Sequence, residues 1–182
     1  MKNRIKILIT LSMLLFMASP MLAQEALKQK PSPLGLVTYK FDDAYVKVTY
    51  SRPHLRGREA FKENSELAPL GKVWRTGANE ATEITVTKAI TMAGVDVPVG
   101  TYTLFSIPEA DKWTIILNKD LGQWGTYKYE QEKDFIRFEV PSEKTKDTYE
   151  PFTIMFDQSN GEVKMQMMWS DTMVEIPVLF LD

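Results

Sequence analysis

Apolar and polar residues alternate along most of the chain in short runs, and this alternation predicts β-strands rather than helices. In one such run, Val46, Val48 and Tyr50 fall on one face of the predicted strand. The same period of two recurs in the later runs. The expected strands are Leu36–Phe41, Ala44–Ser51, Thr82–Lys88, Gly100–Pro108, Lys112–Lys119, 134–141, 150–157, 162–169 and 172–180.

Turn-forming residues separate these runs about every 8 to 12 positions, as in all-β domains. Asp42 and Asp43 lie between the first two runs, and Ser170-Asp171 lies between the last two. Asn160-Gly161 can adopt the positive φ of a type I′ turn, which predicts a hairpin. The pattern therefore predicts an all-β, antiparallel β-sandwich or jelly-roll-like fold.

One segment departs from this pattern. Gly57–Ala68 contains helix-forming residues, with Phe61 and Leu67 as its apolar positions, and it predicts at most one short helix. The polar segment 24–35 reads as a linker, and the length of 36–182 suits a single domain.

The first residues are typical of a secretory signal peptide. Lys2, Arg4 and Lys6 precede the apolar run Ile7–Ala18, which is shorter than the roughly 20 residues of a membrane-spanning helix. We expect cleavage after Ala23, with cleavage after residue 18 or an uncleaved segment as the alternatives. A periplasmic or secreted location follows, with no membrane span after removal of the signal.

Charge and composition exclude several classes of function. Without residues 1–23 the chain has 19 basic and 24 acidic residues, and this acidic balance argues against a nucleic-acid partner. The sequence contains no cysteine, and His54 is its only histidine. Disulfides, thiolate chemistry and histidine-cluster metal sites are therefore excluded, and we expect neither a metal nor a cofactor.

A basic segment surrounds the histidine. Arg52, His54, Arg56 and Arg58 lie within seven residues of an otherwise acidic chain. Such a cluster could hold an anionic ligand, or it could be a solvated connecting loop.

A second candidate is the stretch "GKVWRTGANEAT", which carries Trp74, Arg75, Asn79 and Glu80 around Gly77. We expect Gly77 to adopt a positive φ at a sharp turn. The polar side chains could satisfy the backbone groups of that turn, or Arg75 could grip a carboxylate or phosphate. We expect mixed behaviour, with stability the larger effect of changing Arg75.

The third candidate is the glycine-containing loop from Asn118 to Asp134. Trp124, Tyr127 and Tyr129 could form an exposed platform for a sugar or peptide, or they could be buried and close one end of the domain.

Catalytic and copper readings have weaker support. A hydrolase would need an acid and a base from Glu80, His54 or Asp134, and no particular residue is indicated as catalytic. Met165 and Met167 could be copper ligands, but the alternation places them beside Val163 and Trp169, as core residues would be.

Several motifs, in this order, resemble the family labelled domain of unknown function 2911, which comprises exported bacterial proteins with one β-rich domain. The resemblance runs from about Leu36 to Val178 and implies no activity, substrate or catalytic residue. Two departures are Leu70, where a tyrosine is expected, and a longer path at 62–66. The motifs are "YSRPHLRGREAF", "LAPLGKVWRTGANEAT", "VPVGTYTLFSIP", "WTIILNKDLGQWGTYKY" and "DFIRFEV".

The favoured interpretation is a non-catalytic binding module for a small molecule, glycan or peptide. The alternatives are a metal-independent hydrolase of envelope or extracellular polymers, and a purely structural envelope protein.

Overall fold

The computed structural model describes residues 30–159 and 161–181. The predicted signal peptide, its cleavage site and Asn160 lie outside the described residues. From Pro31 onward the chain forms one compact unit. None of the described helical segments has the length and apolar character needed to cross a membrane.

The described residues form nine strands in one antiparallel sheet, in the order β1-β2-β3-β6-β7-β8-β9-β4-β5. Neighbours in sequence are mostly neighbours in the sheet, as short turns require. The strands are β1 (Leu34–Phe41), β2 (Ala44–Ser51), β3 (Thr82–Val86), β4 (Ile90–Met92), β5 (Val95–Val97), β6 (Gly100–Pro108), β7 (Lys112–Asn118), β8 (Asp134–Ser159) and β9 (Glu162–Phe180).

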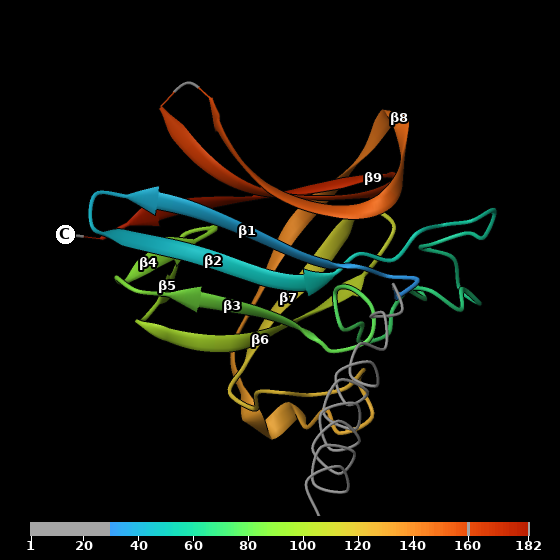
Figure 1. Cartoon of the computed structure of the whole chain (residues 1–182), viewed down its shortest axis with the longest axis horizontal. Helices are drawn as coiled ribbons and strands as arrows, with labels where there is room; N and C mark the ends of the chain where they lie inside the picture. Colours follow the sequence, from blue (N-terminus) through green and yellow to red (C-terminus); the bar gives the residue numbers. More distant parts are fainter. Residues whose placement is uncertain (1–29, 160, 182) are drawn as a thin grey trace, which may run out of the picture. The chain divides into compact units, whose positions relative to one another are not determined.

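Two long strands fold this sheet into two layers. The first part of β8 pairs with β7, and from Ser142 onward β8 pairs with β9. The far end of β9 then pairs with β4. Figure 1 shows β8 and β9 curving over the side of the sheet that holds β1 and β2. The predicted all-β, sandwich-like class is confirmed, because β8 takes part in both layers.

The main core lies between the layers. Val46, Val48 and Tyr50 of β2 are buried there, as their alternation predicts. Rings also meet in this core: the indoles of Trp74 and Trp169 stack with centroids 5.7 Å apart. Burying each large apolar side chain stabilises the fold by about 1.5 to 3 kcal/mol.

A smaller cluster lies on the opposite face of the β6–β7 pair. Ile116 points away from Trp113 and Ile115, as predicted, yet it is fully buried. It packs with Phe105, and the Tyr129 ring from the following loop meets Phe105 edge-on at 5.0 Å. The loop after β7 therefore covers the outside of the sheet.

The segment Gly57–Ala68, for which at most one short helix was expected, forms turns and bends. Ser65 Oγ accepts hydrogen bonds from the backbone N–H groups of Leu67 and Ala68, which holds the backbone in a turn. Phe61, with a φ of 57°, packs its ring 4.8 Å from that of Trp113. Among the described residues, the helical turn present is the 3-10 turn Gln131–Lys133.

Strand boundaries differ from the prediction in three ways. The four last predicted strands form two continuous ones. β8 runs from Asp134 to Ser159 without a break, and Ser170, with a φ of 55°, bends β9 without ending it. The β4–β5 hairpin is additional: its three-residue strands are too short to show alternation, and Ala93-Gly94 form its turn. The first strand begins at Leu34 rather than residue 36, whereas β3 and β7 end at residues 86 and 118.

The predicted tight turns after β1 and β8 are present where the structure describes them. Phe41 pairs with Ala44 across Asp42, and Ser159 pairs with Glu162 across Gly161, which has a φ of 79°.

Candidate functional site

Trp74 anchors the second candidate stretch to the core. Its backbone exchanges hydrogen bonds of 2.7 and 2.9 Å with Ser106 of β6, and its ring is only 3% exposed. The indole Nε1 donates to the Gly77 carbonyl oxygen at 3.2 Å. Trp74 therefore holds the loop in place and offers little ring surface to a ligand.

The expected positive φ at Gly77 is wrong. The left-handed residues are its neighbours Thr76 and Asn79, with φ of 51° and 55°. Gly77 is needed for a different reason: a Cβ there would lie 2.9 Å from the Ser51 carbonyl oxygen and 3.1 Å from Thr82 Oγ1. The loop thus passes so close to the end of β2 that a side chain has no room.

Asn79 acts as a bridge within the fold. Its Nδ2 donates at 3.3 Å to the Ser32 carbonyl oxygen and at 3.3 Å to Ser51 Oγ. These bonds connect the loop to the segment before β1 and to the end of β2.

Arg75 differs from its neighbours because little of its hydrogen-bonding capacity is used. Its Nε donates to the Gly77 carbonyl oxygen at 3.4 Å, a long bond. No described Asp or Glu pairs with this guanidinium. Partial burial lowers the pKa of Arg75, and the nearby Tyr127 opposes that shift. The side chain is therefore a partly desolvated cation without a described counter-charge.

The loop after β7 docks onto this stretch. The Ala81 N–H donates to the Gln123 carbonyl oxygen at 2.8 Å, and the Gly125 N–H donates to the Asn79 carbonyl oxygen at 3.0 Å. Glu80 and Trp124 form a backbone bridge between these bonds. Two candidate regions more than 40 residues apart in sequence thus form one surface.

The docked loop exposes two aromatic rings. Trp124 is 54% exposed and Tyr127 is 84% exposed. Both rings border an open cavity of about 400 Å³, a size found in small-molecule sites. The cavity is lined by Asp120, Leu121, Gly122, Gln123, Trp124, Tyr127 and Lys128.

Gln123 is a site residue that sequence reasoning missed. Its side chain is only 6% exposed, and its Nε2 donates to the Asp120 carbonyl oxygen at 3.1 Å. Its Oε1 is buried and accepts no hydrogen bond from the described residues. The flanking glycines Gly122 and Gly125, with φ of 68° and 65°, are the sequence signal that this segment has an unusual conformation.

A polar network fixes the base of the same loop. Asp134 accepts hydrogen bonds from Tyr129 at 2.7 Å, Arg137 at 2.6 Å and Asn118 at 2.8 Å. Burial, followed by the hydrogen bond to Asp134, raises the pKa of Tyr129 to about 12. Asp134 has both carboxylate oxygens engaged, so its geometry suits anchoring better than proton transfer.

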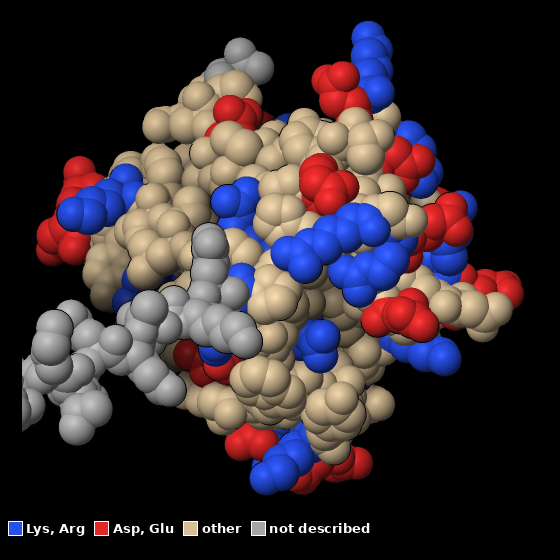
Figure 2. All heavy atoms as spheres, turned by 45° about the vertical axis from the view of Figure 1, so that its right-hand side comes forward, with Lys and Arg blue, Asp and Glu red and all other residues tan. Residues whose placement is uncertain are grey.

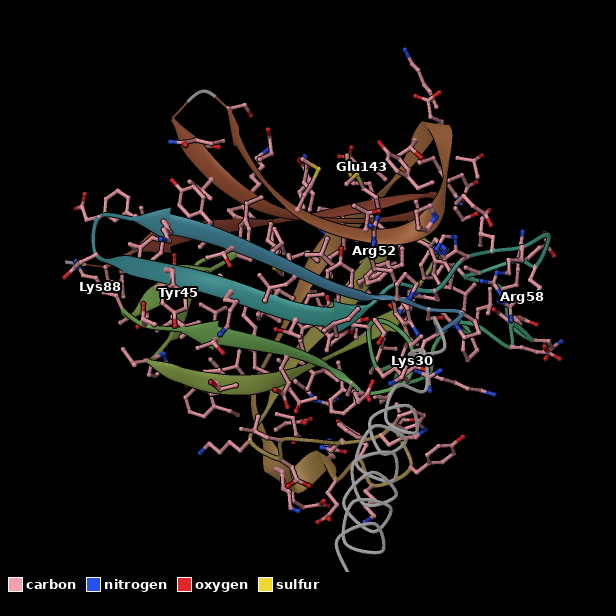
Figure 3. All side chains as sticks on the ribbon, viewed as in Figure 1. Lys30, Tyr45, Arg52, Arg58, Lys88 and Glu143 are labelled. Carbon is pink, nitrogen blue, oxygen red and sulfur yellow. The ribbon has the colours of Figure 1, made fainter. Side chains whose placement is uncertain are left out.

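The basic segment directs its cations to the fold itself. Arg52 Nη2 donates to Thr153 Oγ1 at 2.9 Å, Arg56 Nη2 to the Pro31 carbonyl oxygen at 2.9 Å, and Arg58 Nη2 to the His54 carbonyl oxygen at 3.0 Å. Figure 3 shows Arg52 and Arg58 well separated, with Arg58 out on the loop. On the face seen in Figure 2, basic and acidic side chains are interspersed. The side-chain hydrogen bonds of Arg52, Arg56 and Arg58 to the described residues do not reach Arg75 or Trp124.

The part of the sequence that builds this surface matches a known family. A family model described as "Protein of unknown function (DUF2911)" matches residues 32–178. The chain belongs to this family. Membership in the DUF2911 family confirms the resemblance seen in the sequence, and it attaches no activity to the site. No curated protein and no solved structure matches the chain.

The described part of this DUF2911 domain contains no group of three or more His, Asp or Glu side chains arranged to hold a metal ion. Met165 and Met167 are fully buried in the main core, where their thioethers pack with apolar neighbours.

Proposed function

We propose that this domain is a non-catalytic binding module, and that it binds a small molecule, glycan or peptide on the surface formed by residues 75–80 and 120–128. The observation that carries the proposal is the exposure of Trp124 and Tyr127 beside a cavity. Exposed rings on a fixed frame are a common means of binding, because they offer a large contact area at little conformational cost.

The fixed frame is part of the support. Backbone hydrogen bonds at Ala81 and Gly125 join the two loops, and Gly122 N–H donates to Glu83 Oε1 at 2.9 Å. Tyr129 and Asp134 hold the other end of the loop. The rings are therefore presented by a segment tied down at several points, which lowers the entropic cost of binding.

The proposal includes export, on the basis of the basic and apolar pattern of residues 1–23. Expression of the whole chain in a bacterial host should give a periplasmic protein whose intact mass lacks residues 1–23. A full-length mass in the membrane fraction would contradict export as a released protein.

Binding is tested on the protein recovered from that periplasm. A panel of neutral sugars, acidic sugars and short peptides is screened by thermal shift, and hits are titrated by tryptophan fluorescence. Trp124→Ala should weaken binding of a hit about tenfold or more, since a tenfold change corresponds to about 1.4 kcal/mol.

Leu179→Ala is the matched control, because Leu179 is 64% exposed on β9, outside the candidate surface. Equal affinity of parent, Trp124→Ala and Leu179→Ala for every hit would overturn the proposal. The folded state of each variant is checked by its melting curve, and exposed substitutions of this kind change stability by less than about 0.5 kcal/mol.

A further inference from the structure

Arg75 is the feature of the site that the exposed rings do not explain. Several other described cations have acidic partners: Lys112 lies 2.8 Å from Glu139, and Lys164 lies 3.0 Å from Glu175. The Arg75 guanidinium is partly buried, and its one hydrogen bond to a described residue goes to the Gly77 carbonyl oxygen. A partly desolvated charge without a partner is costly, so an anion that reaches it gains more than it would at a solvated lysine.

The guanidinium lies beside the aromatic surface. A Cβ built on Gly125 would lie 3.2 Å from Arg75 Nη1 and 3.1 Å from Tyr127 Cε2. The guanidinium and the tyrosine ring therefore both lie next to Gly125. Gly125 is itself buried, so the guanidinium and the edge of the Tyr127 ring pack close to the backbone there. A ligand that covers the Tyr127 ring therefore comes within reach of the Arg75 fork, which pairs with a planar carboxylate through two parallel hydrogen bonds.

The cavity that Trp124 and Tyr127 border is lined by polar as well as apolar residues. Buried Gln123 Oε1 has no described donor, and the exposed Lys128 and partly exposed Asp120 stand on the same wall. The exposed Lys128 favours a ligand that brings hydrogen-bond acceptors, and the hydroxyl groups of a sugar can accept from it.

The backbone around the site disfavours an extended peptide. Peptides commonly bind by adding a strand, which requires free N–H and C=O groups along an edge. Here the Ala81 and Gly125 N–H groups already donate to the opposite loop. The donors that remain are on side chains, as in sites for compact polar molecules.

We propose that the ligand is a sugar carboxylate of the uronate type, with its ring on Trp124 and Tyr127 and its carboxylate on Arg75. This inference rests on the binding function proposed above and names its ligand class. The apolar C–H face of the sugar covers the rings, the carboxylate receives the Arg75 fork, and hydroxyl groups meet the polar cavity wall.

The experiment titrates the exported protein with D-glucuronate and D-glucose, which differ only in the carboxylate at C6. We expect glucuronate to bind about tenfold or more tightly than glucose, a difference of about 1.4 kcal/mol. Its affinity should fall as salt is added, because the contact involves charges.

Two substitutions separate charge from fork geometry. Arg75→Met should reduce the affinity for glucuronate to that for glucose, and Arg75→Lys should retain part of the preference, because lysine keeps the charge and loses the bidentate fork. Lys88→Met is the control, since Lys88 follows the opposite end of β3 from Arg75. Melting curves of all variants without ligand show whether each one is folded.

The outcomes distinguish the two proposals. Equal binding of glucose and glucuronate, with both lost in Trp124→Ala, would overturn the carboxylate and leave the binding surface in place. Tighter binding of glucose 6-phosphate or of a short peptide than of glucuronate would also overturn the ligand class. If neither the parent protein nor Trp124→Ala bound any ligand of the panel, both the binding surface and the ligand class would be overturned.

Discussion

The basic segment around His54 and the loop around Arg75 both present arginines at the end of β2 or close to it, yet they use them differently. The Nη2 groups of Arg52, Arg56 and Arg58 donate to acceptors of the fold itself. Arg75 leaves both Nη groups without a described acceptor. A high local density of cations in the sequence therefore does not by itself leave donors free for a ligand, whereas the Arg75 guanidinium keeps donors that the described fold does not use.

The largest effect on stability is expected from Gly77→Ala. This substitution tests whether the loop that carries Arg75 is held rigidly against the end of β2. The added Cβ would lie 2.9 Å from a backbone oxygen of Ser51, which cannot move easily. We expect a loss of about 1 to 3 kcal/mol in the free energy of unfolding, measured with urea, because crowding in a packed site has costs of this size. Unchanged stability would show that the loop can move away from β2.

A smaller effect should separate the two kinds of arginine. Arg52→Met removes the bond to Thr153 Oγ1 and a 3.3 Å bond to the Phe152 carbonyl oxygen, and should lower stability by about 1 to 2 kcal/mol without changing ligand affinity.

Arg75→Met should have the reverse effect. It removes one long hydrogen bond together with an unpaired, partly buried charge, so stability should stay within about 1 kcal/mol of the parent. The structure thus shifts our expectation for Arg75 from stability toward ligand affinity. If Arg75→Met melted far below Arg52→Met, Arg75 would be the arginine that stabilises the fold, and the comparison would be reversed.

The smallest effect concerns the base of the aromatic loop. Because the folded protein raises the pKa of Tyr129 to about 12, the folded state holds this proton more tightly than the unfolded chain does. The resulting stabilisation is complete below pH about 10, the ordinary tyrosine pKa, and is lost as the pH rises toward 12. This stabilisation is reduced because Tyr129 and its partners are partly exposed to solvent.

Tyr129→Phe removes this titration. The difference in free energy of unfolding between the parent and Tyr129→Phe should therefore narrow between pH about 9 and about 11.5. A constant difference over that range would mean that folding does not raise the pKa of Tyr129.

The fold was largely predictable because alternation and burial have the same cause. Val46, Val48 and Tyr50 point inward since one face of β2 meets the core. The β4–β5 hairpin was missed because three residues give too little alternation. Residues 57–68, where at most one short helix was expected, form turns because contacts of Phe61 with the core outweigh local propensity.

The site was predictable only in part. The sequence identified Arg75, Trp124 and Tyr127 as separate candidates, but their proximity depends on hydrogen bonds between Ala81 and Gln123 and between Asn79 and Gly125. Pairings across more than 40 residues leave no local pattern. The spare donors of Arg75 and the unpaired oxygen of Gln123 likewise appear only once every neighbour is in place.

The pairing of β4 with the far end of β9 also sets the order in which this protein can assemble during synthesis. Ile90 lies opposite Phe180, so the partner of an early strand is made some 90 residues later. Strands β1, β2 and β3 can pair as soon as they leave the ribosome, whereas the second layer must wait for β9. Such distant pairing slows folding. During synthesis, β4 therefore has no partner in β9 until the last residues of the strand are made.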